Sequence, residues 1–182
     1  SFHNAFEGNN YSTEAIKGFN LFMGKAQCGT CHFFPVFNGS KPPYIGSEFE
    51  VIGTPGNLKL NTLSTDSGRY LINPANETLH AFRTPTLLNI SYTAPYMPNG
   101  IYKTLDEVID FYDAGGGQGT GIDVPNQTLS GDSLHLTKLE KKQLRIFLES
   151  LNETLAAKKP ETILLPKSRF KYLNARKSRG EY

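Results

Sequence analysis

The 182-residue chain has no tryptophan, only two cysteines and two methionines, and no run of 18 apolar residues. The missing apolar run means that no membrane-spanning helix is predicted. Both cysteines lie in one short string and the remaining histidines are scattered singly, so no second pair of ligands exists for a four-ligand zinc site. What is present is a chain of single-domain length, whose 17 glycines and 11 prolines favour short elements joined by long loops.

The two cysteines occur in the string Cys28-Gly-Thr-Cys31-His32. A thioredoxin-type redox pair has the same C-x-x-C spacing, but it follows a strand in a βαβ unit. Here the preceding segment predicts a helix instead, with Ser12 as its N-cap. The apolar residues of that helix recur at helical spacing: Ile16, Phe19, Phe22, Met23 and Ala26. C-x-x-C followed directly by His is the attachment string of a c-type haem, so the sequence predicts one covalently bound haem c.

The chemistry of haem attachment explains the spacing of these three side chains. Thioethers from Cys28 and Cys31 would reach the two vinyl positions on one edge of the porphyrin, and His32 would ligate the iron from the proximal side. Such attachment takes place outside the bacterial cytoplasm, so we expect a bacterial protein that is periplasmic or otherwise exported. The lack of spare cysteines agrees with this expectation.

Two further helices are marked by capping boxes. The first opens at Thr104, with Glu107 three residues later, and the glycines 115–117 end it. The second opens at Thr137 with Glu140. Its apolar face consists of Leu144, Phe147, Leu148 and Leu151.

Helices near both ends enclose residues 35–85, a region punctuated by Gly, Pro and Asn that predicts loop. The expected fold is mainly α: a cytochrome c-like haem domain with long loops over residues 1–151. Residues 152–182 are expected to form a basic C-terminal extension, because 167–182 contain six Lys or Arg and one Glu. The rest of the chain then holds 13 basic and 16 acidic residues, which indicates a solvated or partner-docked tail and no nucleic acid partner.

Five stretches, in this order, resemble the bacterial di-haem cytochrome c peroxidase family, closest to its MauG-like branch. They are GFNLFMGKAQCGTCH (18–32), DSGRY (66–70), FRTPTLLNISYTAPYMPNG (82–100), TLDEVIDFYDAGGG (104–117) and LTKLEKKQLRIFLESL (136–151). The resemblance is to the C-terminal haem domain of that family. Its members carry another haem domain, which reacts with peroxide and has no counterpart in this chain. The tryptophan thought to bridge the two haems belongs to that other domain, which agrees with the absence of tryptophan here.

The sixth ligand of the iron is open between two residues. Met/His ligation raises the potential and suits electron transfer, and Met97 is the candidate because Met23 is expected to pack in the core. By the resemblance, however, the methionine position of the peroxidases falls on Tyr112, and the MauG-like branch has a tyrosine ligand there. Tyr112 is therefore the preferred distal ligand, and Met97 is the alternative ligand. Tyr112 could instead pack in the interior without ligating the iron. A phenolate oxygen would lower the potential.

Four more residues are candidates for binding roles. The segment containing Thr93 and Pro95 is similar to the family's interdomain calcium loop, in which backbone carbonyls at these two positions are ligands. Two carbonyls do not complete a site, so calcium is expected only together with the missing domain. Arg69 and Arg83 are candidate partners of the haem propionates, because guanidinium groups match carboxylates, although both also suit a solvated surface.

The resemblance implies an oxidoreductase that is active only together with the second haem domain or chain. This haem would pass electrons from a small redox protein to the other haem, where hydrogen peroxide or a protein substrate would react. The alternative, from a different class, is a stand-alone monohaem c-type cytochrome that acts as an electron carrier. A Met97 ligand would favour the carrier.

Overall fold

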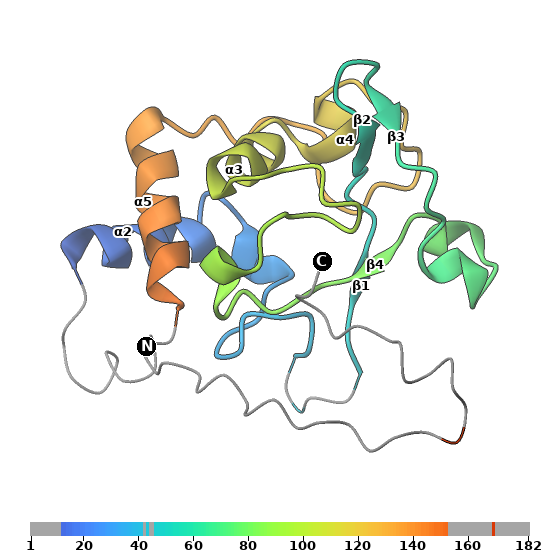
Figure 1. Ribbon diagram of the computed structural model, residues 1–182. Coiled ribbons are helices and arrows are strands. Elements are labelled where there is room, and N and C mark those ends of the chain that lie inside the picture. The colour runs from blue at the N-terminus through green and yellow to red at the C-terminus, as the bar shows by residue number, and fades with distance from the viewer. Residues whose placement is uncertain (1–11, 42, 44–45, 153–168, 170–182) are drawn as a thin grey trace.

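The computed structural model describes residues 12–41, 43, 46–152 and 169 (Figure 1). Helices α2 (Thr13–Met23) and α5 (Lys138–Ser150) lie against each other at one side of the molecule (Figure 1). The Ser12 hydroxyl caps α2 by accepting the Ala15 N–H at 3.1 Å, and Thr137 caps α5 in a complete capping box. Both helices thus start where their capping residues predict.

The main hydrophobic core lies where α2 meets α5. Gly18 is buried in this contact, and a Cβ there would lie only 2.1 Å from the Gln143 carbonyl oxygen. The aromatic rings of Phe22, Phe37 and Phe147 pack together, with centroid separations of 5.2 to 5.8 Å. These three side chains are at most 1% exposed, so they form the centre of the cluster.

Helix α3 (Leu105–Asp113) contacts α5 and adds Leu105 and Ile109 to the same core. The Thr104 hydroxyl accepts the Glu107 N–H and the Glu107 carboxylate accepts the Thr104 N–H, which completes the predicted capping box. The glycine run does end α3, but it then forms a further helical turn, α4 (Gly116–Gly119), which was not predicted. Gly115, with a φ of 98°, separates the two helices.

Between α2 and α3 the chain forms short strands, 3-10 turns and loops. Strand β1 (Phe49–Glu50) pairs antiparallel with β4 (Phe82–Arg83), and β2 (Pro55–Asn57) pairs with β3 (Thr62–Leu63). The 3-10 helices are η1 (Cys28–Thr30), η2 (Arg69–Leu71), η3 (Asn76–Thr78) and η4 (Ile90–Tyr92). A second, smaller cluster of buried side chains lies beside β1 and α4 and consists of Val51, Ala81, Ile122 and Val124.

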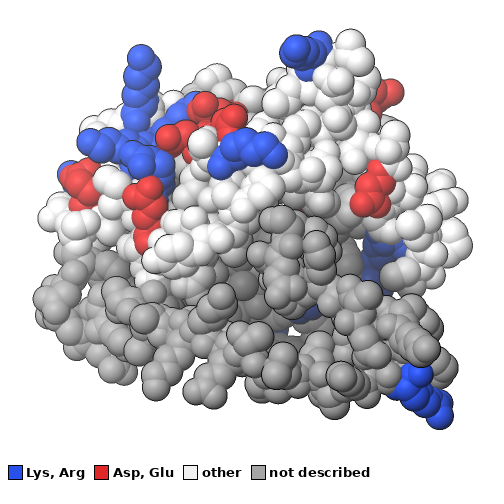
Figure 2. Space-filling model, viewed as in Figure 1, with Lys and Arg blue, Asp and Glu red and all other residues white. Residues whose placement is uncertain are grey.

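The described residues therefore combine four α-helices with two small antiparallel sheets, so helix is less dominant than expected. No helix in these segments is long and apolar enough to cross a bilayer. The predicted basic extension 152–182 lies outside the described residues except for Asn152 and Arg169. Charged side chains gather over α2, α3 and α5 (Figure 2), where Lys141 bridges Asp110 and Asp113, and Lys25 pairs with Glu140.

Candidate functional site

The Cys-x-x-Cys-His string forms one tight turn directly after α2. Gly24 ends the helix, Gln27 adopts a left-handed conformation, and Cys28 starts η1. The N–H of His32 donates to the Cys28 carbonyl at 3.0 Å, which closes the turn. Local hydrogen bonding thus brings the two thiols and the imidazole of the string together, as the motif predicts.

His32 is held by two backbone carbonyls. Its Nδ1 lies 3.2 Å from the carbonyl oxygen of Phe37 and 3.1 Å from that of Pro85. Since carbonyls only accept, Nδ1 carries the hydrogen and Nε2 keeps its lone pair for a metal. Burial lowers the pKa of His32, so the imidazole is neutral at neutral pH. A neutral histidine oriented by a backbone acceptor is the arrangement typical of metal ligands.

The two thiols are free cysteines in protected surroundings. Burial raises the pKa of Cys28 to about 12. Burial also raises the pKa of Cys31, and the neighbouring Glu50 carboxylate raises it further. Both side chains are therefore neutral thiols at neutral pH, rather than the reactive thiolates of a redox pair.

Tyr112, on the last turn of α3, shares these surroundings. Burial is the largest cause that raises the pKa of Tyr112, and electrostatic interactions with Cys28, Cys31 and Glu50 add to it. Its hydroxyl therefore lies within electrostatic range of both thiols, although 80 residues separate it from His32 in sequence. Its ring packs against Phe111 at a centroid separation of 5.5 Å. The structure thus brings Tyr112, the preferred distal ligand, into the neighbourhood of Cys28 and Cys31.

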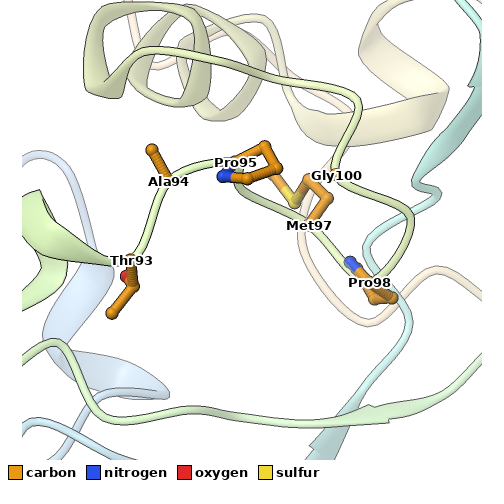
Figure 3. A pocket seen from close by; sticks show the side chains of 6 residues that line it. All are labelled: Thr93, Ala94, Pro95, Met97, Pro98 and Gly100. Atoms are coloured by element: carbon orange, nitrogen blue, oxygen red, sulfur yellow. The ribbon is translucent and has the colours of Figure 1, made fainter. Parts of the chain in front are cut away.

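The alternative ligand, Met97, lies on the loop after η4. This loop surrounds a cavity of about 530 Å³ (Figure 3), which is lined by Thr93, Ala94, Pro95, Met97, Pro98 and Gly100. Both expected calcium ligands, Thr93 and Pro95, therefore line the same cavity as Met97. The other methionine, Met23, is 46% exposed and lies against Gly29, so the expectation that it packs in the core is wrong. Met23 is the last residue of α2, and its side chain lies over the turn that contains Gly29 rather than over α5.

The two arginines lie beside β1. The Arg69 guanidinium stands 4.0 Å above the ring centroid of Phe49. The Nε of Arg83 donates to the Ser47 hydroxyl at 3.0 Å. Neither contact bears on the expected binding of haem propionates. Both place the guanidinium groups next to β1, the strand that carries Glu50.

Three contributors to the site were not predicted: the carbonyls of Phe37 and Pro85, and the Glu50 carboxylate. The carbonyls reach His32 from residues 5 and 53 positions away. Backbone groups leave no signal in the composition, so these two carbonyls could not be predicted from the sequence. Glu50 lies in the region predicted as loop, and no motif marks it.

The donor set fits a c-type haem. Two neutral thiols could form the thioethers, the imidazole keeps Nε2 free for the iron, and the Tyr112 phenol on α3 could supply a further ligand. The Cys28 and Cys31 thiols and the Tyr112 hydroxyl, from α3, lie within electrostatic range of one another.

No family model matches the chain. Comparison with known proteins finds relatives named as cytochrome-c peroxidases or as MauG. The chain is 33% identical over 161 residues to the cytochrome-c peroxidase IdrP2 of Denitromonas iodatirespirans, covering 80% of this chain and 41% of that protein. It is 32% identical over 146 residues to the methylamine utilization protein MauG of Methylorubrum extorquens, covering 79% and 36%. The chain thus spans about two fifths of the length of these relatives.

Solved structures show the same fold. A MauG-like protein associated with microbial copper homeostasis superposes with a TM-score of 0.65 at 25% identity, covering 84% of this chain and 48% of the other. The diheme peroxidase BthA from Burkholderia thailandensis has a TM-score of 0.56 at 18% identity, covering 84% and 46%. The likeness to BthA concerns the fold alone.

Proposed function

Since this chain belongs to the bacterial di-haem cytochrome c peroxidase and MauG-like family, we propose that it is a haem-c electron-transfer domain, cytochrome c-like in fold, which works with a second haem domain. One of these relatives is a cytochrome-c peroxidase by name, and this chain corresponds to only part of each. The activity is therefore proposed for the pair of domains, and this chain is assigned one half of it.

The residues divide the work of holding the cofactor. Cys28 and Cys31 would anchor it covalently, and His32 and Tyr112 would ligate its iron. When bound, the haem would supply one-electron redox chemistry, which no side chain can provide alone. Arg69 and Arg83 are proposed partners of the propionates, from positions beside β1.

The observation that carries this proposal is the way His32 is oriented. Two carbonyls from separate segments fix Nδ1, in the same turn that presents both thiols. Neither a packed core histidine nor a thiol redox pair needs this combination. It is what a proximal ligand next to a covalent anchor requires.

If His32 and Tyr112 both ligate the iron, they would leave it no free ligand position for peroxide. The chain alone is then expected to be a poor peroxidase, while peroxide or a protein substrate reacts at the second haem. We propose a small redox protein as electron donor and a periplasmic or otherwise exported location. Calcium, held by the Thr93 and Pro95 carbonyls, is proposed only at the junction with the second domain.

The ligand assignment is tested by Tyr112→Phe in protein matured with its haem. The substitution is expected to abolish the phenolate-to-iron absorption band and to raise the midpoint potential by at least about 59 mV, which is tenfold in the ratio of oxidised to reduced iron. Tyr102→Phe is the matched control, because Tyr102 is buried against Phe111 at 5.5 Å and is not a proposed ligand. An unchanged spectrum and potential in Tyr112→Phe would refute Tyr112 ligation. Met97→Leu would then be the change that moves both, as the electron-carrier alternative requires.

Native mass spectrometry with iron counting separates the two functions. A second polypeptide that bears its own haem supports the two-domain enzyme. A lone chain with one iron, able to exchange electrons with a small redox protein, supports the carrier.

A further inference from the structure

The segment 48–52, which contains β1, links the two sides of the site. At its start, the Glu48 N–H donates to the Gly39 carbonyl at 2.9 Å, and the Thr84 N–H donates to the Glu48 carbonyl at 3.2 Å. Thr84 directly precedes Pro85, whose carbonyl holds His32. At its other end, the Ile52 carbonyl accepts the Gly117 N–H at 2.9 Å, in the turn that follows the helix of Tyr112.

Glu50 lies in the middle of this segment, at the end of β1. It belongs to β1 and faces Phe82 across the pairing with β4. Its charge contributes to the raised pKa values of both Cys31 and Tyr112, in each case after burial, the largest cause. The carboxylate is thus near the haem anchor and near the proposed distal ligand at the same time.

The basic side chains near this segment contact groups other than Glu50. Lys41 pairs with Glu48 and lies 5.4 Å from the centroid of the Phe33 ring. Arg69 stacks on Phe49, and Arg83 donates to Ser47. Within the described part of the chain, no ion pair joins Glu50 to a cation. Its charge is only partly screened, because the residue is half-buried.

We propose that Glu50 is an electrostatic determinant of the haem potential, a carboxylate close to Cys31 and Tyr112 that would favour the oxidised iron. This inference rests on the proposed function, since it requires the haem to be attached at Cys28 and Cys31. Oxidised iron carries one more positive charge than reduced iron. A nearby negative charge therefore stabilises the oxidised state more, and it does so strongly where water is partly excluded. Glu50 would thereby act in the same direction as the Tyr112 phenolate.

The test compares Glu50→Gln with Glu77→Gln in haem-matured protein. Each substitution removes one negative charge and keeps the side-chain shape, but Glu77 lies exposed on η3. By potentiometric titration, Glu50→Gln is expected to raise the midpoint potential by about 59 mV, a tenfold change in the ratio of reduced to oxidised iron at fixed potential. Glu77→Gln is expected to change that ratio by less than about twofold. Glu50→Asp, which keeps the charge, should remain closer to the unmodified protein than Glu50→Gln.

Electron paramagnetic resonance of the oxidised proteins separates two kinds of failure. If the His/Tyr signature is intact and the Glu50→Gln midpoint does not move, or moves no more than that of Glu77→Gln, this inference is overturned and the proposed function stands. If the unmodified protein carries no covalent haem or lacks that signature, the proposed function fails. If the amide prevents maturation, Glu50→Ala removes the charge without adding N–H donors, and the same rise is expected of it.

Discussion

Phe147 links the helical core to the proximal side of the site. Its side chain is fully buried, and its ring lies 5.2 Å from that of Phe22, which in turn lies 6.4 Å from the His32 ring. Phe147→Ala is expected to lower the free energy of unfolding by about 3–5 kcal/mol, because transfer and cavity costs add. Denaturant unfolding monitored by circular dichroism measures the change.

Leu139→Ala is the control for that substitution. Leu139 is on the same helix but 60% exposed, so its truncation should change stability by no more than about 0.5 kcal/mol. Equal losses in the two variants would contradict the placement of Phe147 at the centre of the core.

At the scale of single residues, the sequence identified the groups with distinctive chemistry. Cys28, Cys31 and His32 follow from one motif, and Tyr112 was located by resemblance. The groups that orient them could not be identified in this way. The carbonyls of Phe37 and Pro85 act through backbone atoms, which every residue has, and their positions depend on how the long loops fold.

At the scale of elements, the crossing of α2 and α5 depends on Gly18. In an isolated helix, Gly18→Ala would be stabilising by about 1 kcal/mol, because alanine is the better helix former. Here the added Cβ would lie 2.1 Å from the Gln143 carbonyl oxygen and 2.7 Å from the Phe147 Cβ. The helices must separate, so we expect a net loss of about 1–3 kcal/mol in thermal or denaturant unfolding.

Asn20→Ala provides the comparison on the same helix. Asn20 is exposed. Because alanine is the better helix former, its replacement should stabilise the protein by about 0.5 kcal/mol. A Gly18→Ala variant that is as stable as Asn20→Ala would show that the two helices do not approach so closely.

Helices and strands differed in how well the sequence predicted them. Both capping boxes marked the start of a helix correctly, because a cap is a local interaction within four residues. Strands β1 to β4 are two or three residues long, which is too short for any alternation of apolar and polar residues. They exist because distant segments pair, and only tertiary structure determines that pairing.

At the scale of the whole molecule, acid stability depends on an ion pair between two distant segments. Lys25, after α2, lies 2.8 Å from Glu140 on α5. Lys25 is the largest cause that lowers the pKa of Glu140, and the Thr137 N–H adds to it, bringing the value to about 2 from 4.5. The folded pKa lies below the unfolded one, so this stabilisation is present above pH 4.5 and is lost as the pH falls towards 2.

Glu140→Gln should therefore be less stable at neutral pH and should lose less stability than the unmodified protein between pH 4.5 and 2. Lys25→Met should give the same flatter profile, whereas exposed Lys59→Met should keep the original one. Melting temperatures measured across this pH range test the prediction. A Glu140→Gln profile parallel to that of the unmodified protein would exclude the ion pair as the cause.

The two hydrophobic clusters differ in their ability to persist without the cofactor. The larger one joins α2, α5 and the three buried phenylalanines, whereas the smaller one has only Val51, Ala81, Ile122 and Val124 at its centre. So small a cluster buries little apolar area, so it has less stability of its own to lose when the cofactor is absent. In the double variant Cys28→Ser/Cys31→Ser, which cannot form thioethers, we expect the smaller cluster to loosen first.

Hydrogen exchange followed by mass spectrometry measures this difference. In the double variant, amides around the smaller cluster, such as those of Gly117 and Thr128, should exchange at least about tenfold faster than in the haem-bearing protein, because their hydrogen bonds to Ile52 and Val51 open more often. Amides within α2 and α5 should change much less, because that core does not need the cofactor. Uniform acceleration would mean that the two clusters unfold as one unit. Unchanged protection at both clusters would mean that the attached haem contributes nothing to the core.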